Sequence, residues 1–435
     1  MLLSGRHRMG TPAITSIAAR RPHGRFAWFW EAPRSSRRTL LAAWLGWLLD
    51  GFDVMLYALV LGTLVNEWSL TKASAGLLGS LTLVASGVGG VLFGSIADRW
   101  GRRPALIGSL LVYSVFTFAC GLSTTIWQLA VCRFLLGLGM GGEWTAGAAL
   151  VAESWPDSHR GRAMGVMQSA WSVGYALATV VAALVLPRFG WRAVFFVGIA
   201  PAFLALWMQQ SVEESSEWRQ SRARRSTAPG PLQSLFSRPY LMPTVLLTVL
   251  STTTIFAYWG LNLWIPAYFA LPRTEGGLGL NTETTTLLVI LTQAGTFLGY
   301  LSFGFMADSW GRRPSFVIYM LAGAVLILGF AAARNIWILA ILAPVTTFFA
   351  TGFFSGFGAV TGELYPTPIR ATAAGLTFNA GRISSAISPF VVGSMAETQG
   401  FGTAFALLAA ALALGAATWI WLPETRLGSP IAMRT

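Results

Sequence analysis

The chain has 435 residues, of which 54% are hydrophobic and only 11% are charged, and its formal net charge is +13. A soluble domain would carry about a quarter charged residues, so this composition excludes an ordinary soluble protein and indicates one that crosses a membrane many times. The basic residues are arginines clustered between apolar runs, with Lys72 as the single lysine. That clustering is typical of cytoplasmic loops, and we expect no nucleic-acid partner.

The chain opens with an Arg-rich segment, residues 1–38. It lacks the short apolar core and small-residue cleavage site of a signal peptide, so we expect a cytoplasmic tail. Cys120 and Cys132 fall inside apolar runs without metal-binding spacing. We expect them to be small packing residues and expect no metal site.

Apolar runs of about 20 residues follow the tail, each long enough to cross roughly 30 Å of hydrocarbon. Such runs must be helical, because lipid offers no partner for unpaired backbone groups. We therefore predict an all-α membrane protein with twelve transmembrane helices. The runs lie approximately at 40–65, 75–97, 104–122, 125–148, 162–186, 190–209, 241–270, 284–307, 314–333, 336–360, 371–397 and 402–422.

The chain repeats itself with an offset of 210 residues. "GSIADRWGRRP" from Gly94 matches "GFMADSWGRRP" from Gly304, and "VAESWPDSHRGRA" from Val151 lies over "TGELYPTPIRATA" from Thr361. We predict two six-helix halves, 39–210 and 241–423, joined by a cytoplasmic linker, 211–240, and followed by a cytoplasmic tail, 424–435. Repeats of this kind place a site between the halves near the membrane midplane.

The repeated turn, D-x-x-G-R-R-P, reverses the chain between the second and third spans of each half. Gly101 permits a tight backbone and Pro104 suits the first turn of the next helix. We hypothesise that Asp98 and Asp308 pair with an arginine or a helix N-terminus across the seam in one conformation only. The alternative is that the arginines merely set topology. The predicted conformational latch comprises Asp98, Arg102, Arg103, Glu153, Arg160, Asp308, Arg312, Arg313, Glu363 and Arg370.

Ionisable groups inside the spans cost about 2.5–3.5 kcal/mol each and therefore point to function. Helical rise places Asp50 and Arg133 at similar depth, and we expect them to be in contact. Asp53 shares that face of the first helix, so one of the two carboxylates can hold a proton. The alternative is that Asp50 only anchors Arg133 or caps a helix break. The proton-coupling candidates are Asp50, Asp53, Arg133 and Glu143, the last of which could instead belong to an inner gate.

Arg382 lies near the middle of the eleventh span, and the second half offers no acidic residue at that depth. We hypothesise that Arg382 binds a substrate carboxylate as a bidentate fork, with Asn379 adding a hydrogen bond. The alternative is that Arg382 pairs with Asp50 or Asp53 across the cavity, or with backbone carbonyls. Other side chains expected to line the cavity are Tyr57, Gln168, Trp171, Tyr175, Asn262 and Gln293.

The paired turns look like the loop signature of the major facilitator superfamily, and "RFLLGLGMGGEW" from Arg133 resembles its fourth-helix motif. "PETR" at Pro423 is similar to the ending of sugar-porter-like members. "WLGWLLDGFDVMLYALVL" from Trp44 and "ESWPDSHRGRAMG" from Glu153 resemble more closely the sialate:proton symporters, which carry sialic acid and monocarboxylates. Related aromatic-acid:proton symporters also carry D-G-aromatic-D in the first helix. The resemblance implies transport by alternating access in the bacterial plasma membrane.

We therefore expect a monomeric carrier that imports a small organic anion together with a proton. It would need no cofactor, because the proton gradient supplies the energy. The sequence contains no catalytic triad, metal spacing or nucleotide-binding loop, so we expect neither an enzyme nor an ATP-driven pump. The alternatives are an aromatic-acid:proton symporter, a neutral-sugar transporter and a nutrient sensor built on a carrier fold.

Overall fold

The computed structural model of the chain describes residues 27–68, 72–223, 231–270 and 272–426. These ranges are helical and contain no β-strand, as a bilayer requires. Ten of their helices are long and apolar enough to cross a membrane. The remaining two expected spans, 162–186 and 371–397, correspond to α6 and to the broken pair α15 and α16. Most of the expected N-terminal tail, part of the linker and most of the C-terminal tail lie outside the described residues.

The first half is a bundle of long helices preceded by one short turn of helix. Inside α6 the backbone of Gly190 has φ +73°, a left-handed conformation that favours glycine. The chain breaks its helix there, between the fifth and sixth expected spans. The elements are α1 (Ala27–Trp30), α2 (Arg34–Glu67), α3 (Lys72–Trp100), α4 (Arg102–Leu122), α5 (Ile126–Ser154), α6 (Arg160–Phe196), η1 (Val197–Ile199) and α7 (Ala200–Ser211).

The linker contributes two short helices, α8 (Ser216–Ala223) and α9 (Pro231–Leu235), before the second half begins. The expected tenth span is split by a 3-10 turn, and the eleventh is interrupted between Ser385 and Ser388. The second half consists of α10 (Arg238–Ala270), η2 (Arg273–Glu275), α11 (Thr282–Trp310), α12 (Arg312–Ala332), α13 (Ile336–Gly352), η3 (Phe353–Ser355), α14 (Gly356–Leu364), α15 (Arg370–Ser385), α16 (Ser388–Gln399) and α17 (Phe401–Thr418).

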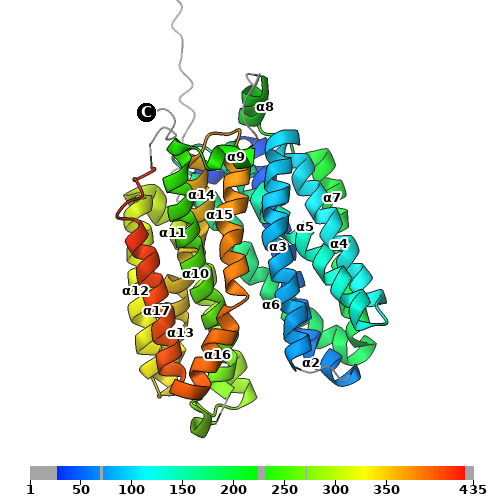
Figure 1. The fold of residues 1–435 in the computed structure, drawn as a ribbon, viewed down its shortest axis with the longest axis vertical. Helices are drawn as coiled ribbons and strands as arrows, with labels where there is room; N and C mark the ends of the chain where they lie inside the picture. The colour runs from blue at the N-terminus through cyan, green and yellow to red at the C-terminus, as the bar shows by residue number, and fades with distance from the viewer. Residues whose placement is uncertain (1–26, 69–71, 224–230, 271, 427–435) are drawn as a thin grey trace, which may run out of the picture.

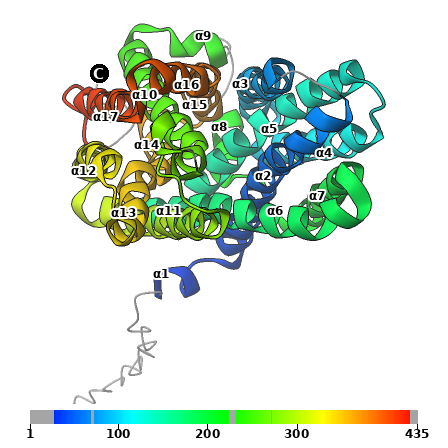
Figure 2. The same ribbon diagram turned by 90° about the horizontal axis from the view of Figure 1, so that it is seen from below.

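The two halves stand side by side with their long helices roughly parallel (Figure 1). The view along these helices shows the seam between the halves, where α3 lies beside α15 and α6 lies beside α11 (Figure 2). The repeated turns and the linker helix α8 lie at one end of the molecule. We call this the Arg-rich end and define it by residues 98–103, 153–162, 308–313 and 363–372.

Glycines bring α3 into backbone contact with neighbours on both sides. A Cβ added at Gly141 of α5 would lie 1.9 Å from the carbonyl oxygen of Ser86, and one at Gly375 of α15 would lie 2.2 Å from that of Gly90. Small residues are what allow membrane helices to approach this closely. The close approach of α3 to α15 aligns the two halves along the seam.

Candidate functional site

The two repeated turns have the same backbone and the same internal ion pair. Gly101 has φ +119° and Gly311 has φ +112°, values that disfavour any residue with a Cβ. Each glycine precedes an arginine that folds back on the aspartate four residues earlier. Arg102 Nη1 lies 3.0 Å from Asp98 Oδ1, and Arg312 Nη1 lies 2.7 Å from Asp308 Oδ1.

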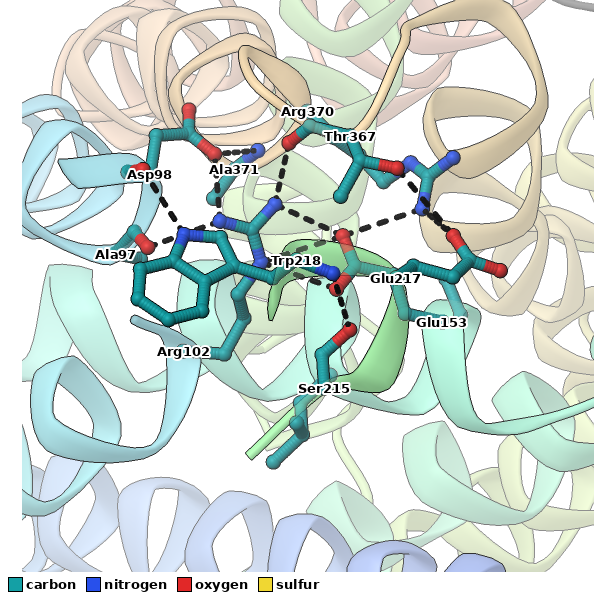
Figure 3. Close-up of polar contacts among 12 residues, drawn as sticks. Ala97, Asp98, Arg102, Glu153, Ser215, Glu217, Trp218, Thr367, Arg370 and Ala371 are labelled. Atoms are coloured by element: carbon teal, nitrogen blue, oxygen red, sulfur yellow. Dashed lines mark hydrogen bonds and ion pairs between the residues drawn. The ribbon is translucent and has the colours of Figure 1, made fainter. Parts of the chain in front are cut away.

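Each aspartate also binds the N-terminus of a helix in the opposite half. The Asp98 carboxylate accepts hydrogen bonds from the backbone N–H groups of Ala371 (3.2 Å) and Thr372 (2.7 Å) at the start of α15 (Figure 3). The Asp308 carboxylate accepts from Gly161 (2.9 Å) and Arg162 (2.8 Å) at the start of α6. A negative charge is stabilised there by the helix dipole and the unpaired N–H groups. The contacts join the halves at the Arg-rich end.

Glu153 receives arginines from both halves. Arg102 of its own half approaches Glu153 Oε1 with Nη2 at 2.8 Å. Arg370 of the second half places Nη1 3.1 Å from the same oxygen (Figure 3). Because all three side chains are buried, the ion pairs compensate charges that water does not reach.

Glu363 occupies the matching position in the second half. Arg312 Nη2 lies 2.7 Å from Glu363 Oε1, and Arg160 of the first half lies 3.7 Å from it. Arg160 also donates to the carbonyl of Ala152 at 2.7 Å. At the Arg-rich end, two equivalent sets of arginines and acids thus form ion pairs between the halves. Their role as a conformational latch stays a prediction.

A cavity of about 500 Å³ lies between the two halves, farther along the helices from the contacts at the Arg-rich end. Its walls come from α2, α3, α5 and α6 of the first half and from α10, α15 and α16 of the second. It reaches toward the end opposite the Arg-rich end, because Gly79 and Ser80 near the start of α3 line it while Asp98 ends the same helix. Of the residues predicted to bind substrate, the cavity brings together Tyr57, Trp171, Tyr175, Asn262 and Arg382, and Arg133, a proton-coupling candidate, also lines it.

Arg382, which lines this cavity, pairs with the buried Asp50 of the first half. Arg382 Nη2 lies 3.7 Å from Asp50 Oδ2, and the guanidinium carbon lies 5.6 Å from the ring of Trp47 and 5.7 Å from that of Phe378. Neither carboxylate oxygen of Asp50 has a hydrogen-bond partner among the described residues. The predicted contact of Asp50 with Arg133 is wrong, because the partner of Asp50 comes from the other half.

Arg133 forms a separate group with Tyr57 and Asp53. Its guanidinium carbon lies 4.0 Å from the centre of the Tyr57 ring, a cation–π distance, and it interacts electrostatically with Asp53. Arg133 is 3% exposed, and its Nε and Nη1 have no hydrogen-bond partner in the described part of the chain. Helical spacing therefore places two acids one turn apart on α2, each near a different arginine.

Glu143 is a third buried acid beside these groups. Both of its carboxylate oxygens lack a hydrogen-bond partner within the described ranges, and it interacts electrostatically with Asp50 and Arg382. A Cβ added at Gly46 would lie 2.3 Å from Glu143 Oε1, so the side chain rests on bare backbone of α2. Three carboxylates then share two guanidinium groups, and a low-dielectric site cannot keep all of these acids ionised without cost.

Comparison with known proteins decides the family. The family model described as "Major Facilitator Superfamily" matches residues 43–273 and 269–434. The chain belongs to the Major Facilitator Superfamily. A protein of Cupriavidus pinatubonensis named "Probable 4-methylmuconolactone transporter" is 34% identical over 92% of this chain and 94% of its own length. The sialic acid transporter NanX of Escherichia coli is 29% identical over 88% of this chain and 93% of its own.

The fold of this superfamily member agrees with a solved structure of a relative. The proton:xylose symporter XylE superposes with a TM-score of 0.74 at 21% identity, covering 92% of this chain and 98% of the other. The all-α fold of twelve spans and the resemblance stated from the sequence are thus confirmed. The protein is a multi-pass inner-membrane transporter and not an enzyme.

An aromatic pair lies between this transporter's cavity and the Arg-rich end. The rings of Trp144 on α5 and Phe378 on α15 stack with centroids 3.8 Å apart and planes inclined by 16°. Trp144 Nε1 donates to Gln168 Oε1 at 3.4 Å. Gln168 lines a smaller chamber that Arg382 shares with the main cavity. The two halves therefore also meet through these stacked rings, between the cavity and the ion pairs of the Arg-rich end.

Two predicted binding residues lie elsewhere. Asn379 lines neither chamber; its Nδ2 donates to the carbonyl of Gly375 at 3.0 Å and to Thr145 Oγ1 at 3.4 Å, and it packs against Gly90 across the seam. It shares the eleventh span with Arg382 but points at α3. Gln293, on α11, is half-buried and also lines neither chamber.

Sequence reasoning missed the acids that bind the backbone of the repeated turns. Glu214 accepts from the N–H groups of Arg102 (3.0 Å) and Arg103 (3.1 Å), and Glu424 accepts from those of Arg312 (2.8 Å) and Arg313 (3.0 Å). Arg103 and Arg313, two predicted latch residues, thus bind these acids through their backbone N–H groups. The repeat offset held the signal, because Glu214 and Glu424 are also 210 residues apart.

The linker helix α8 touches both halves as well. Glu217 Oε2 lies 2.8 Å from Arg370 Nη1 of the second half, and the indole N–H of Trp218 donates to the carbonyl of Asp98 in the first half at 3.0 Å (Figure 3). At the same end, the Trp28 ring contacts Trp155 of the first half at 5.1 Å and Phe305 of the second at 6.2 Å. Both segments bridge the seam.

Proposed function

We propose that this transporter imports a small organic anion together with a proton by alternating access. The observation that carries the proposal is the buried Arg382–Asp50 pair, 3.7 Å apart, whose arginine lines the cavity. A buried arginine whose charge is held by a carboxylate without other hydrogen bonds is prepared to exchange that carboxylate for another. The substrate supplies the second carboxylate, and the proton neutralises the first.

The coupling follows from this exchange. While Asp50 is ionised it competes with the substrate for Arg382. Protonation removes that competitor, so the guanidinium turns its two parallel N–H donors to the incoming anion. Release of the substrate lets Asp50 ionise again. Asp53 and Glu143 are further buried acids near Asp50, and either can share the proton with it.

Proton cotransport also offsets the membrane potential, which opposes the entry of an anion. An inside-negative potential opposes entry of an anion by about 2.3 kcal/mol per charge per 100 mV. One proton carried with each monoanion cancels that charge, and the pH gradient then drives accumulation. The arginine-rich loops favour placing the Arg-rich end in the cytoplasm, so the described cavity opens to the outside. We propose a single chain as the working unit.

The 500 Å³ cavity beside Arg382 favours a flat unsaturated acid within this class. Its aromatic walls come from Tyr57, Trp171, Tyr175, Tyr258, Trp259 and Phe390. Aromatic faces stack well on planar π systems. The relatives compared above are named for a muconolactone and for sialic acid.

The test is uptake of labelled acids into proteoliposomes under an imposed pH gradient. We expect accumulation of an unsaturated carboxylic acid and none of a neutral sugar. Asp50→Asn should abolish accumulation driven by the gradient and keep exchange between substrate inside and outside. Arg382→Lys keeps the charge but loses the fork, and should weaken apparent affinity by roughly tenfold or more. Unchanged affinity in that variant, or normal accumulation by Asp50→Asn, would refute the proposal.

A further inference from the structure

A second guanidinium faces the same cavity from the opposite half. Arg133 on α5 and Arg382 on α15 both line the 500 Å³ space. Arg133 is 3% exposed, and two of its nitrogens, Nε and Nη1, have no hydrogen-bond partner among the described residues. Buried guanidinium nitrogens are ordinarily satisfied by an acceptor. The chain described here leaves these donors for something that enters the cavity.

We propose that Arg133 is a second carboxylate subsite, so that the cavity accepts dicarboxylates with one acid group on each half of the transporter. This rests on the proposed function, in which Arg382 binds the first carboxylate. The ligand class is a short organic diacid whose two acid groups reach both arginines.

The stacking of Arg133 suits this role. Its guanidinium lies 4.0 Å from the centre of the Tyr57 ring. A guanidinium stacked on a ring keeps its N–H donors in the plane of the group, at the edge where a carboxylate forms its two parallel hydrogen bonds. Tyr57 therefore orients Arg133 without using its donors.

The spacing of the subsites comes from α2. Arg382 pairs with Asp50, and Arg133 stacks on Tyr57. These two α2 residues are seven positions apart, which is a rise of about 10 Å along a helix. The arginines therefore meet one helix about two turns apart, a separation that an extended diacid with an acid group at each end can match.

The arrangement has a consequence for stoichiometry. Each substrate carboxylate competes with one aspartate for its arginine. A diacid that occupies both subsites is bound best when Asp50 and Asp53 are both protonated. Two protons should therefore enter with a dianion and one with a monoanion, so that both substrates move without net charge.

The experiment compares matched acids at equilibrium on the purified full-length transporter. Calorimetry gives the affinities for benzoate and terephthalate, and for hexanoate and adipate, at one pH and salt concentration. We expect the diacid of a pair to bind roughly tenfold more tightly than its monoacid. Arg133→Gln should weaken the diacid far more than the monoacid, so that the ratio of the two affinities falls to about one. Arg133→Lys, which keeps the charge, should give an intermediate loss.

Arg273→Gln is the matched control, because Arg273 is exposed at the end toward which the cavity opens and does not line it. Equal weakening of monoacids and diacids by Arg133→Gln would assign Arg133 a structural role and overturn the inference. A wild type that binds monoacids but shows no preference for diacids would overturn it too, while the proposed function stands. Binding of neither kind of acid would overturn both.

Discussion

Glu214 and Glu424, which are 210 residues apart, hold the same pair of backbone N–H groups in the two halves of the transporter. Glu214 spans the N–H groups of residues 102 and 103 at 3.0 and 3.1 Å, and Glu424 spans those of residues 312 and 313 at 2.8 and 3.0 Å. Each carboxylate thus caps the third span of its own half. The internal repeat extends beyond the membrane helices into the segments that follow them.

Replacing either acid by its amide should lower the stability of the folded transporter. Glu214→Gln and Glu424→Gln keep the shape but lose the charge that the helix N-terminus stabilises, and we expect a loss of about 1 kcal/mol for each. The losses should add in the double variant, because the sites do not touch. Thermal unfolding in detergent measures the change. Glu213→Gln, an exposed neighbour, is the control, and equal behaviour of all three variants would contradict the assignment.

The aspartate caps across the seam should set how often the Arg-rich end opens. Asp98→Asn weakens the hydrogen bonds to the start of α15, a loss of up to about 2 kcal/mol in a buried geometry. The open population should then rise by about tenfold or more. Spin labels on cysteines placed at Arg99 and Ser309, both exposed at this end, report the opening as a longer distance. Glu213→Gln, an exposed position at the same end, should leave the distances as they are, and so would Asp98→Asn if no latch exists.

The repeat made the Arg-rich end largely predictable. Asp98 and Asp308 could be identified because identical residues recur 210 positions apart. Recognising this repeat does not depend on how each helix is rotated about its axis. The linker contacts could not be found this way. Glu217 and Trp218 have Leu427 and Gly428 at the equivalent positions, so the repeat carries no trace of them.

The charged cavity was predictable in its members but not in its pairs. Counting residues from a helix end gives the depth of Asp50 and Arg133 in the membrane, and the depths agree. It does not give the rotation of α2 and α5 about their axes, or which half supplies the nearer cation. Arg382 reaches Asp50 from the other half because α15 packs along α3, a relationship that only the folded chain reveals.

Gly46 should tolerate no side chain while Glu143 is present. A Cβ at Gly46 would lie 2.3 Å from Glu143 Oε1, so Gly46→Ala should destabilise the fold by roughly 1–3 kcal/mol through overpacking. The same change in a Glu143→Ala background should cost less, and thermal unfolding of the four variants gives the coupling. Gly108→Ala is the control: its Cβ would meet only Phe93 at 3.7 Å, and helix propensity should make it neutral or stabilising. Additive losses would refute the contact.

The stacked pair of Trp144 and Phe378 should act as the inner wall of the cavity. Phe378→Leu removes a ring contact worth about 0.5–1.5 kcal/mol and leaves a thinner barrier toward the Arg-rich end. We expect faster passive proton entry into substrate-free proteoliposomes, followed with a trapped pH dye. Phe203→Leu, at a 68% exposed position, should leak no faster than wild type. Equal leakage by both variants would show that the barrier lies elsewhere.

The bridge made by α8 adds contacts between the halves at the Arg-rich end, so opening that end would cost more free energy. Glu217 and Trp218 tie the linker to both halves at the Arg-rich end, whereas the cavity between the halves reaches toward the opposite end. With that end inside the cell, as proposed, an empty carrier would rest with its outer mouth open. Such a bias suits uptake of substrates at low concentration, because most empty carriers would already be in the outward-open state that binds substrate.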